Sequence, residues 1–278
     1  MKHFYIIFTF VIFSYSKAQN TSNFYIADNG ITCMCPDAEF GDTDSLVFDG
    51  VVKTFTKRTK EQLDVLIASD INDPQIALSC TSGINNMSDL FKDKINFNQD
   101  LSHWDVSNVT DMSFMFYRAL SFNQPINSWN VSSAVTMNHM FSGASNESMA
   151  FNQPLDNWNI SNVTDISWMF GWNALFNQDI NDWDVSNVTD MNHTFWGAFI
   201  FNQPLDNWDV SSVTNMSELF QGAYNFNQEL NDWNVSNVTN MNSMFDDSHS
   251  FNKPLEKGEM VPDWYMIAEQ EIRVKETT

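Results

Sequence analysis

A short unit that recurs along more than half of the chain limits the fold more than any other feature of the sequence. Successive units begin 25 residues apart, except for one interval of 29 residues. A unit of this length cannot bury its own apolar side chains, so the regularity predicts an array in which each unit stacks on the next. We expect the extra residues of the long interval, Asn146–Met149, to bulge from a loop without breaking the stack. The phenylalanines that open the units are Phe97, Phe122, Phe151, Phe176, Phe201, Phe226 and Phe251.

The periodicity of the apolar residues changes halfway along each unit. In the first half, Trp104 and Val106 alternate with polar residues such as His103 and Asp105, which predicts a short strand with its polar residues facing outward. In the second half, apolar residues recur at i, i+3, i+4 and i+7, which predicts a short helical turn. In the first unit these residues are Met112, Met115, Phe116 and Ala119. The sequence therefore predicts an α/β repeat solenoid of strand-and-helix units.

Two residues that recur in the units are expected to hold the stack together. The tryptophan that follows each opening phenylalanine by seven residues shares its parity with the valines, so we expect it in the core. The asparagine directly after each opening phenylalanine, from Asn98 to Asn252, is expected to form a ladder that satisfies backbone groups of neighbouring units. The tryptophans at this position are Trp104, Trp129, Trp158, Trp183, Trp208 and Trp233.

The unit Phe-Asn-Gln-x-Leu-x-x-Trp-Asp-Val-Ser-Asn-Val-Thr-Asp-Met-x-x-Met-Phe resembles the repeats of the BspA-like leucine-rich-repeat surface proteins of bacteria. The clearest copies are residues 97–116, 176–195 and 226–245, and the likeness covers residues 83–255. The resemblance implies a right-handed, leucine-rich-repeat-like stack of short parallel strands and short helical turns, on or outside the cell. It also implies a role in adhesion to host proteins or other cells.

The chain divides into four segments. Residues 1–18 have the lysine, short apolar run and small-x-small ending of a signal peptide, so we expect cleavage near Ala18 and a secreted or cell-surface protein. Residues 19–82 form an N-terminal cap region with a helix over residues 59–69, which starts with a capping-box spacing at Thr59. Residues 83–255 hold a half repeat, six full repeats and the start of a seventh, and residues 256–278 are a C-terminal tail. No segment after the leader is long and apolar enough for a membrane span.

The charge and the cysteines limit the partners and the compartment. A formal charge of -22, from 13 basic and 35 acidic residues, opposes binding to nucleic acid or to an anionic membrane. All cysteines precede the repeats, and export would allow a disulfide between Cys80 and either Cys33 or Cys35.

The candidate binding residues lie where the repeats present side chains outside the core. The aromatic residues Trp168, Trp172 and Trp196 depart from the core register, so they either pack or form an exposed patch that binds a ligand. The polar row that includes Asp105, Asp184 and Asp209 either binds calcium or is a solvated face, and too few carboxylates converge there for a firm metal site.

No catalytic constellation or cofactor motif is recognisable in the sequence. Motifs such as HExxH and GxSxG are absent, and the histidines are scattered over different repeat positions. We therefore predict a non-enzymatic binding or adhesion protein that presents its repeat surface to an extracellular protein or glycan, without cofactor or metal. The alternatives are a structural or decoy surface protein without a dedicated ligand and, third, a carbohydrate-active enzyme. The histidines concerned are His103, His139, His193 and His249.

Overall fold

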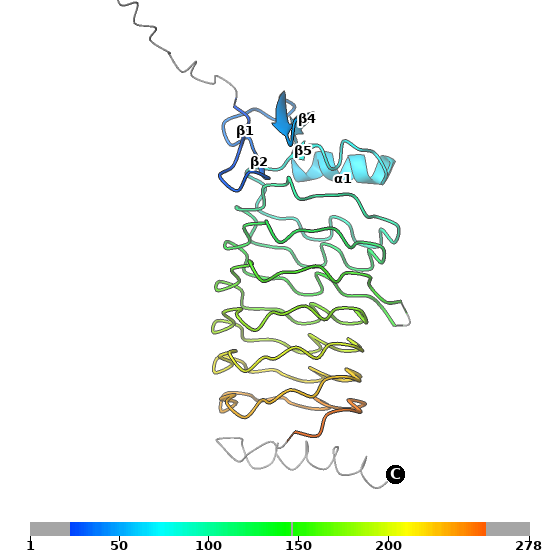
Figure 1. Ribbon diagram of the computed structural model, residues 1–278, viewed down its shortest axis with the longest axis vertical. Coiled ribbons are helices and arrows are strands. Elements are labelled where there is room, and N and C mark those ends of the chain that lie inside the picture. Colours follow the sequence, from blue (N-terminus) through cyan, green and yellow to red (C-terminus); the bar gives the residue numbers. More distant parts are fainter. Residues whose placement is uncertain (1–22, 146, 254–278) are drawn as a thin grey trace, which may run out of the picture.

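The computed structural model describes residues 23–145 and 147–253, and within them an N-terminal unit sits at one end of a stack of coils (Figure 1). The predicted signal peptide, residues 1–18, and the predicted tail, residues 256–278, lie outside the described residues. In the described part of the chain, no helix is long and apolar enough to cross a membrane.

The N-terminal unit contains all the regular strands and the helix of the described residues. Strands β1 (Tyr25–Ile26) and β2 (Cys33–Met34) form an antiparallel pair. Strands β3 (Thr43–Phe48) and β4 (Val51–Lys57) form a hairpin, and β5 (Ser79–Cys80) pairs in parallel with β4. Helix α1 (Lys60–Ser69) begins with the predicted capping box, in which Thr59 and Gln62 bond each other's backbone amides. The predicted helix over residues 59–69 is thereby confirmed.

The predicted α/β class of the repeats is wrong, because the coils contain neither strands nor helices over residues 83–145 and 147–253. Each coil is a series of turns, and one residue per coil forms an isolated parallel bridge to the next coil. The described chain has a single helix and two small sheets, all before residue 81. The bridged residues are Asn86, Asp111, Thr136, Asp165, Asp190, Asn215 and Asn240.

The segment that was predicted to be helical is a chain of turns, because one residue in each coil, and in most coils a second residue four positions later, has a left-handed backbone. Phe114 and Arg118 have φ of 57° and 56°, which no α-helix of L-residues can include. The amides of Met112 and Phe114 donate to Thr136 and Asn138 of the next coil, at 3.1 and 2.9 Å. The intervening amides close tight turns, so the segment binds the neighbouring coil rather than its own backbone. The spacing i, i+3, i+4 thus brings the same side chains inward without a helix.

The core of the stack consists of aromatic ladders that run from coil to coil. The predicted core position of the tryptophans is confirmed, since each is at most 5% exposed. Their indole Nε1 groups donate to carbonyls of the preceding coil, for example Trp158 to Ile126 at 3.1 Å. A second ladder, the inner phenylalanine ladder, has neighbouring rings stacked with centroids 5.4–5.9 Å apart. The inner phenylalanine ladder comprises Phe91, Phe116, Phe141, Phe170, Phe195, Phe220 and Phe245.

The predicted asparagine ladder is also confirmed. The Oδ1 atom of Asn98 accepts a hydrogen bond from the backbone amide of Asn123 at 3.0 Å, and Asn123 accepts from Asn152 at 2.9 Å. The same bond recurs up to Asn227, which accepts from Asn252. The ladder therefore satisfies a backbone donor of each coil at the corner where the next coil begins.

The insertion lies two residues earlier than predicted. Ala144 and Glu147 form an antiparallel bridge that closes the extra loop, with Asn146 outside the described residues. Met149, which was expected to bulge, is fully buried in the core. Its apolar side chain explains the difference, because burial keeps Met149 in the stack, whereas Ser145 is exposed and Glu147 is only half-buried.

Candidate binding surface

The three tryptophans that depart from the core register lie together on the outside of the stack. The ring centroids of Trp168 and Trp196 are 4.6 Å apart, and those of Trp172 and Trp196 are 5.1 Å apart. Both contacts are edge-to-face, and all three side chains are half-buried. The side chains therefore pack against one another and also face solvent, which combines the two alternatives that the sequence left open. We call these residues the tryptophan cluster.

Trp168 also belongs to a line of residues that follows the axis of the stack. Each coil contributes the first of its left-handed residues to this line, and no member is buried. A left-handed backbone turns these side chains away from the core, at a cost of about 1–2 kcal/mol for each residue that carries a β-carbon. We call this line the outward column, and it consists of Asp89, Phe114, His139, Trp168, His193, Glu218 and Ser243.

The middle of the outward column is a continuous stack of rings. Centroid distances are 4.3 Å between Phe114 and His139, 5.1 Å between His139 and Trp168, and 4.2 Å between Trp168 and His193. These rings are within 14° of parallel, so each central ring is covered on both faces. The edges of the central rings, rather than their faces, are therefore accessible to a binding partner.

Charged residues close the two ends of the ring stack. At one end, the Lys92 ammonium lies over the Phe114 ring, 4.7 Å from its centroid. At the other end, His193 Nε2 lies 2.9 Å from a carboxylate oxygen of Glu218. The apolar strip is therefore bounded along the axis, in the manner of a binding patch with a polar rim.

Two glycines make room for the tryptophan cluster. A β-carbon at Gly171 would lie 2.8 Å from the Trp168 ring, and one at Gly197 would lie 3.0 Å from the Trp172 ring. Gly197 also has a left-handed φ of +67°. These positions are glycine because the indoles occupy the space that a larger residue would need.

Burial keeps the two histidines of the outward column neutral. Desolvation lowers the pKa of His139 to about 4, and it also lowers the pKa of His193 despite the opposing charge of Glu218. Both rings are therefore uncharged near pH 7 and extend the apolar strip. The prediction that the histidines occupy unrelated repeat positions is wrong for this pair, which shares one position two coils apart.

The polar row with Asp105, Asp184 and Asp209 is not a uniform outer face. Asp184 and Asp209 are exposed, and each accepts a hydrogen bond from the backbone amide two residues later, at 3.1 and 3.0 Å. These bonds are turn contacts, and hydrogen bonds from the Ser211 hydroxyl and then from its backbone amide lower the pKa of Asp209. Among residues 23–145 and 147–253, no group of three or more His, Cys, Asp or Glu side chains could hold a metal ion.

Asp105 and His103 were expected to face outward, and the structure buries both at 4% and 8% exposure. The reason is the N-terminal unit, which covers the first coil. Ser82 donates to Asp105 at 2.6 Å, and the amide of Cys33 donates to the His103 carbonyl at 2.8 Å. Asp105 therefore joins the two parts of the molecule.

The structure contains one of the two disulfides that the sequence allowed. Cys35 is bonded to Cys80, and Cys33 is a buried free thiol. Burial raises the pKa of the Cys33 thiol to about 12, with Asp105 and Asp44 adding to the effect. A thiol with this pKa is unreactive near neutral pH.

The fold and the surface define a repeat protein whose stacked coils carry an aromatic strip on one side. Residues 66–171 and 144–258 each match the family described as Mycoplasma protein of unknown function, DUF285, and the chain belongs to this family. The two matches overlap and together span the repeats and the end of the N-terminal unit. No curated protein and no solved structure matches the chain.

Proposed function

We propose that the chain is a secreted or cell-surface protein that binds another protein through the tryptophan cluster and the ring stack of the outward column. The observation that carries this proposal is the rigid, half-buried strip of rings from Phe114 to His193. Large aromatic residues held in fixed positions with a polar rim are typical of the energetic centres of protein interfaces.

The arrangement of the rings favours a protein over a sugar at this strip. Sugars stack on open aromatic faces, but Trp168 has a histidine ring on each face, at 5.1 and 4.2 Å. The exposed edges instead suit apolar side chains and backbone carbonyls, because ring edges carry partial positive charge. A glycan that binds here is the competing outcome of the experiment below.

Export is supported by two features of the sequence and the structure. The leader over residues 1–18 has the composition of a signal peptide, and the Cys35–Cys80 disulfide is stable in oxidising compartments. The resemblance to BspA-like surface proteins adds a precedent for adhesion. A structural or decoy role without a dedicated partner is the second candidate function.

The experiment is a binding screen of the purified chain against defined extracellular matrix proteins, serum proteins and a glycan array. The test variants are Trp168→Ala and Trp196→Ala, and the control is Phe40→Ala, an exposed aromatic residue of the N-terminal unit. A protein ligand should lose about thirtyfold in affinity with each test variant and remain unchanged with the control.

Three results would contradict the proposal. A protein ligand that binds both test variants as well as the unaltered chain would remove this strip as the interface. Glycans that require Trp196 would replace the protein partner by a sugar. Failure of all probes would favour the structural or decoy role.

A further inference from the structure

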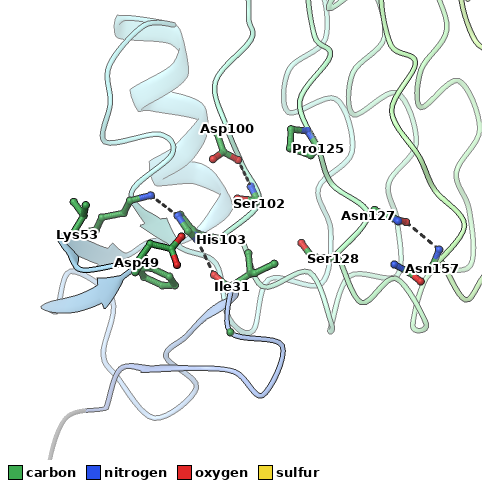
Figure 2. A pocket seen from close by; sticks show the side chains of 13 residues that line it. Ile31, Asp49, Lys53, Asp100, Ser102, His103, Pro125, Asn127, Ser128 and Asn157 are labelled. Carbon is green, nitrogen blue, oxygen red and sulfur yellow. Dashed lines mark hydrogen bonds between the residues drawn. The ribbon is translucent and has the colours of Figure 1, made fainter.

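A second candidate site lies between the N-terminal unit and the first coils, and it shares no residue with the tryptophan cluster. The pocket has a volume of about 650 Å³, which is within the range of small-molecule sites. Figure 2 shows its walls, with Asp49 and Lys53 of the β3–β4 hairpin on one side and Asp100, Ser102 and Asn157 of the coils on the other. We call it the junction pocket.

The junction pocket is a built site, because hydrogen bonds fix its hairpin wall to the coils. His103 lies at the contact, where its Nδ1 is 2.8 Å from the Ile31 carbonyl and its Nε2 is 2.6 Å from the Lys53 ammonium (Figure 2). The carbonyl requires a donor, so Nδ1 carries the proton and Nε2 accepts from Lys53. These two hydrogen bonds, from His103 to Ile31 and from Lys53 to His103, hold the Lys53 ammonium in place at the edge of the pocket.

The polar groups of the junction pocket are mostly unused by the protein. Among the described residues, Lys53 forms no ion pair and donates only to His103, which leaves further N–H groups of its ammonium available. The side-chain amide of Asn157 and the hydroxyl of Ser102 form no hydrogen bond within the described chain. One carboxylate oxygen of Asp100 accepts from the Ser102 amide, and the other is available. Donors and acceptors therefore face one cavity together.

Apolar side chains supply the rest of the wall. Ile31 and Val51 are 37% and 58% exposed, and Pro125 of the second coil also lines the pocket. Adjacent donors, acceptors and apolar patches match a pyranose, whose hydroxyls each donate and accept while its C–H groups form an apolar face. A purely apolar ligand would leave the polar groups without partners.

The charge of the chain opposes an anionic ligand, and the hydrogen-bonding needs of Lys53 oppose a cationic one. One lysine is accompanied by two aspartates, Asp49 and Asp100, and the whole chain carries a formal charge of -22. An anion would be repelled by the protein at long range. A cation would be attracted by the aspartates but could not accept from the Lys53 N–H groups, which would stay without a partner in the pocket. From this combination we propose that the junction pocket binds a neutral sugar residue at the end of a glycan.

The experiment is saturation-transfer NMR and titration of the purified full chain with neutral hexoses, N-acetylhexosamines and uronic acids. Asn157→Ala should weaken binding of a neutral sugar about threefold to tenfold, because it removes one hydrogen-bonding side chain. Lys53→Met should weaken it about tenfold or more, since the lost bond is charge-assisted. The matched controls are Asn207→Ala, at the equivalent position two coils further along, and Lys94→Met.

Several outcomes distinguish the proposal from its competitors. Binding of neutral sugars that both test variants weaken and both controls retain would support it, with affinity changing less than about twofold when salt screens the charges. Preference for uronic acids, binding unaffected by Asn157→Ala, or no binding of any sugar would overturn it. Lys53→Met also removes the hydrogen-bond partner of His103 and could unfold the chain. If Lys53→Met unfolds, the effect of Asn157→Ala on sugar binding decides whether the proposal holds. Trp196→Ala should leave sugar binding unchanged, which separates this result from the proposed protein interface.

Discussion

The inner phenylalanine ladder and the outward column are two lines of side chains that follow the same coils at the same spacing. The inner ladder has phenylalanine at all of its positions and is buried, whereas the outward column changes residue at nearly every coil and is never buried. Stacked rings occur in both lines, at 5.9 Å between Phe141 and Phe170 and at 5.1 Å between His139 and Trp168. The repeated residue thus holds the stack, and the variable one gives each coil a surface of its own.

The largest expected effect comes from truncating neighbouring residues of the two lines. Phe170→Ala should lower the free energy of unfolding by about 3–5 kcal/mol, because Phe170 is fully buried and stacks on Phe141, Phe176 and Phe195. Trp168→Ala, two residues away, should cost about 1–2 kcal/mol, since its ring is partly solvated and has fewer core contacts. Chemical denaturation of both variants measures the difference. Equal losses would show that the outward column also supports the fold.

The second-largest expected effect on the free energy of unfolding concerns the asparagine ladder, where the repeated residue is polar. Asn152 accepts hydrogen bonds from the Asn177 amide at 3.0 Å and from the Gln178 side chain at 2.9 Å. Asn152→Ala should lower the free energy of unfolding by about 1–3 kcal/mol, because these partly buried donors lose their acceptor. The control is Asn162→Ala, which removes an exposed bond to the Ser132 carbonyl and should cost less than about 1 kcal/mol. If the two variants are equally stable, the ladder contributes nothing beyond a surface contact.

The inner lines of this molecule could be predicted from the sequence, because burial and repetition act on the same residues. The core tryptophans, the ladder that begins at Asn98, and the capping box at Thr59 all follow from position and residue type. The prediction of strands and helices in the repeats was wrong for a physical reason. A period of two, or a spacing of i, i+3, i+4, places side chains on one side of a turn as readily as on one side of a strand or helix.

The outward column was only partly predictable. Trp168, Trp172 and Trp196 were recognisable as departures from the repeat, but His139 and His193 were not assigned to the same line. The 29-residue interval conceals them, although each lies 17 residues after its opening phenylalanine, as Trp168 does. The left-handed backbone was not predictable, because residues such as Phe114 and Trp168 rarely adopt it. The junction pocket also could not be foreseen, since its walls come from distant segments of the chain.

A pH titration tests the column more finely than truncation does. Burial lowers the pKa of His139 from its ordinary value of 6.5 to about 4 in the folded chain, so the unfolded chain binds more protons between these values. Stability from this ring is therefore complete above about pH 6.5 and is lost as the pH falls toward 4. Solvent reaches part of the ring, so we expect a loss of about 1–2 kcal/mol.

The matched variant for this titration is His139→Phe. The equivalent position of the preceding coil holds Phe114 at φ 57°, so phenylalanine is compatible with the backbone there. The difference in free energy of unfolding between the chain and this variant should change with pH in that range, whereas the titration of carboxylates cancels in the subtraction. A constant difference from pH 7 to pH 4 would mean that His139 is solvated and does not belong to an apolar strip.

The smallest effect concerns the backbone of the outward column. Ser243 has φ of 54°, a conformation in which a β-carbon is unfavourable, so Ser243→Gly should leave the free energy of unfolding unchanged or raise it by up to about 1 kcal/mol. At Ser236, which is not left-handed, the same substitution should lower it by about 0.5–1 kcal/mol, because glycine loses more conformational entropy on folding. If the coil imposes the left-handed backbone against the preference of the residue, the two substitutions should shift the melting temperature in opposite directions in thermal unfolding. Melting-temperature shifts of the same sign would mean that the left-handed position carries no strain. Residues with a β-carbon in the outward column would then not lower the stability of the fold.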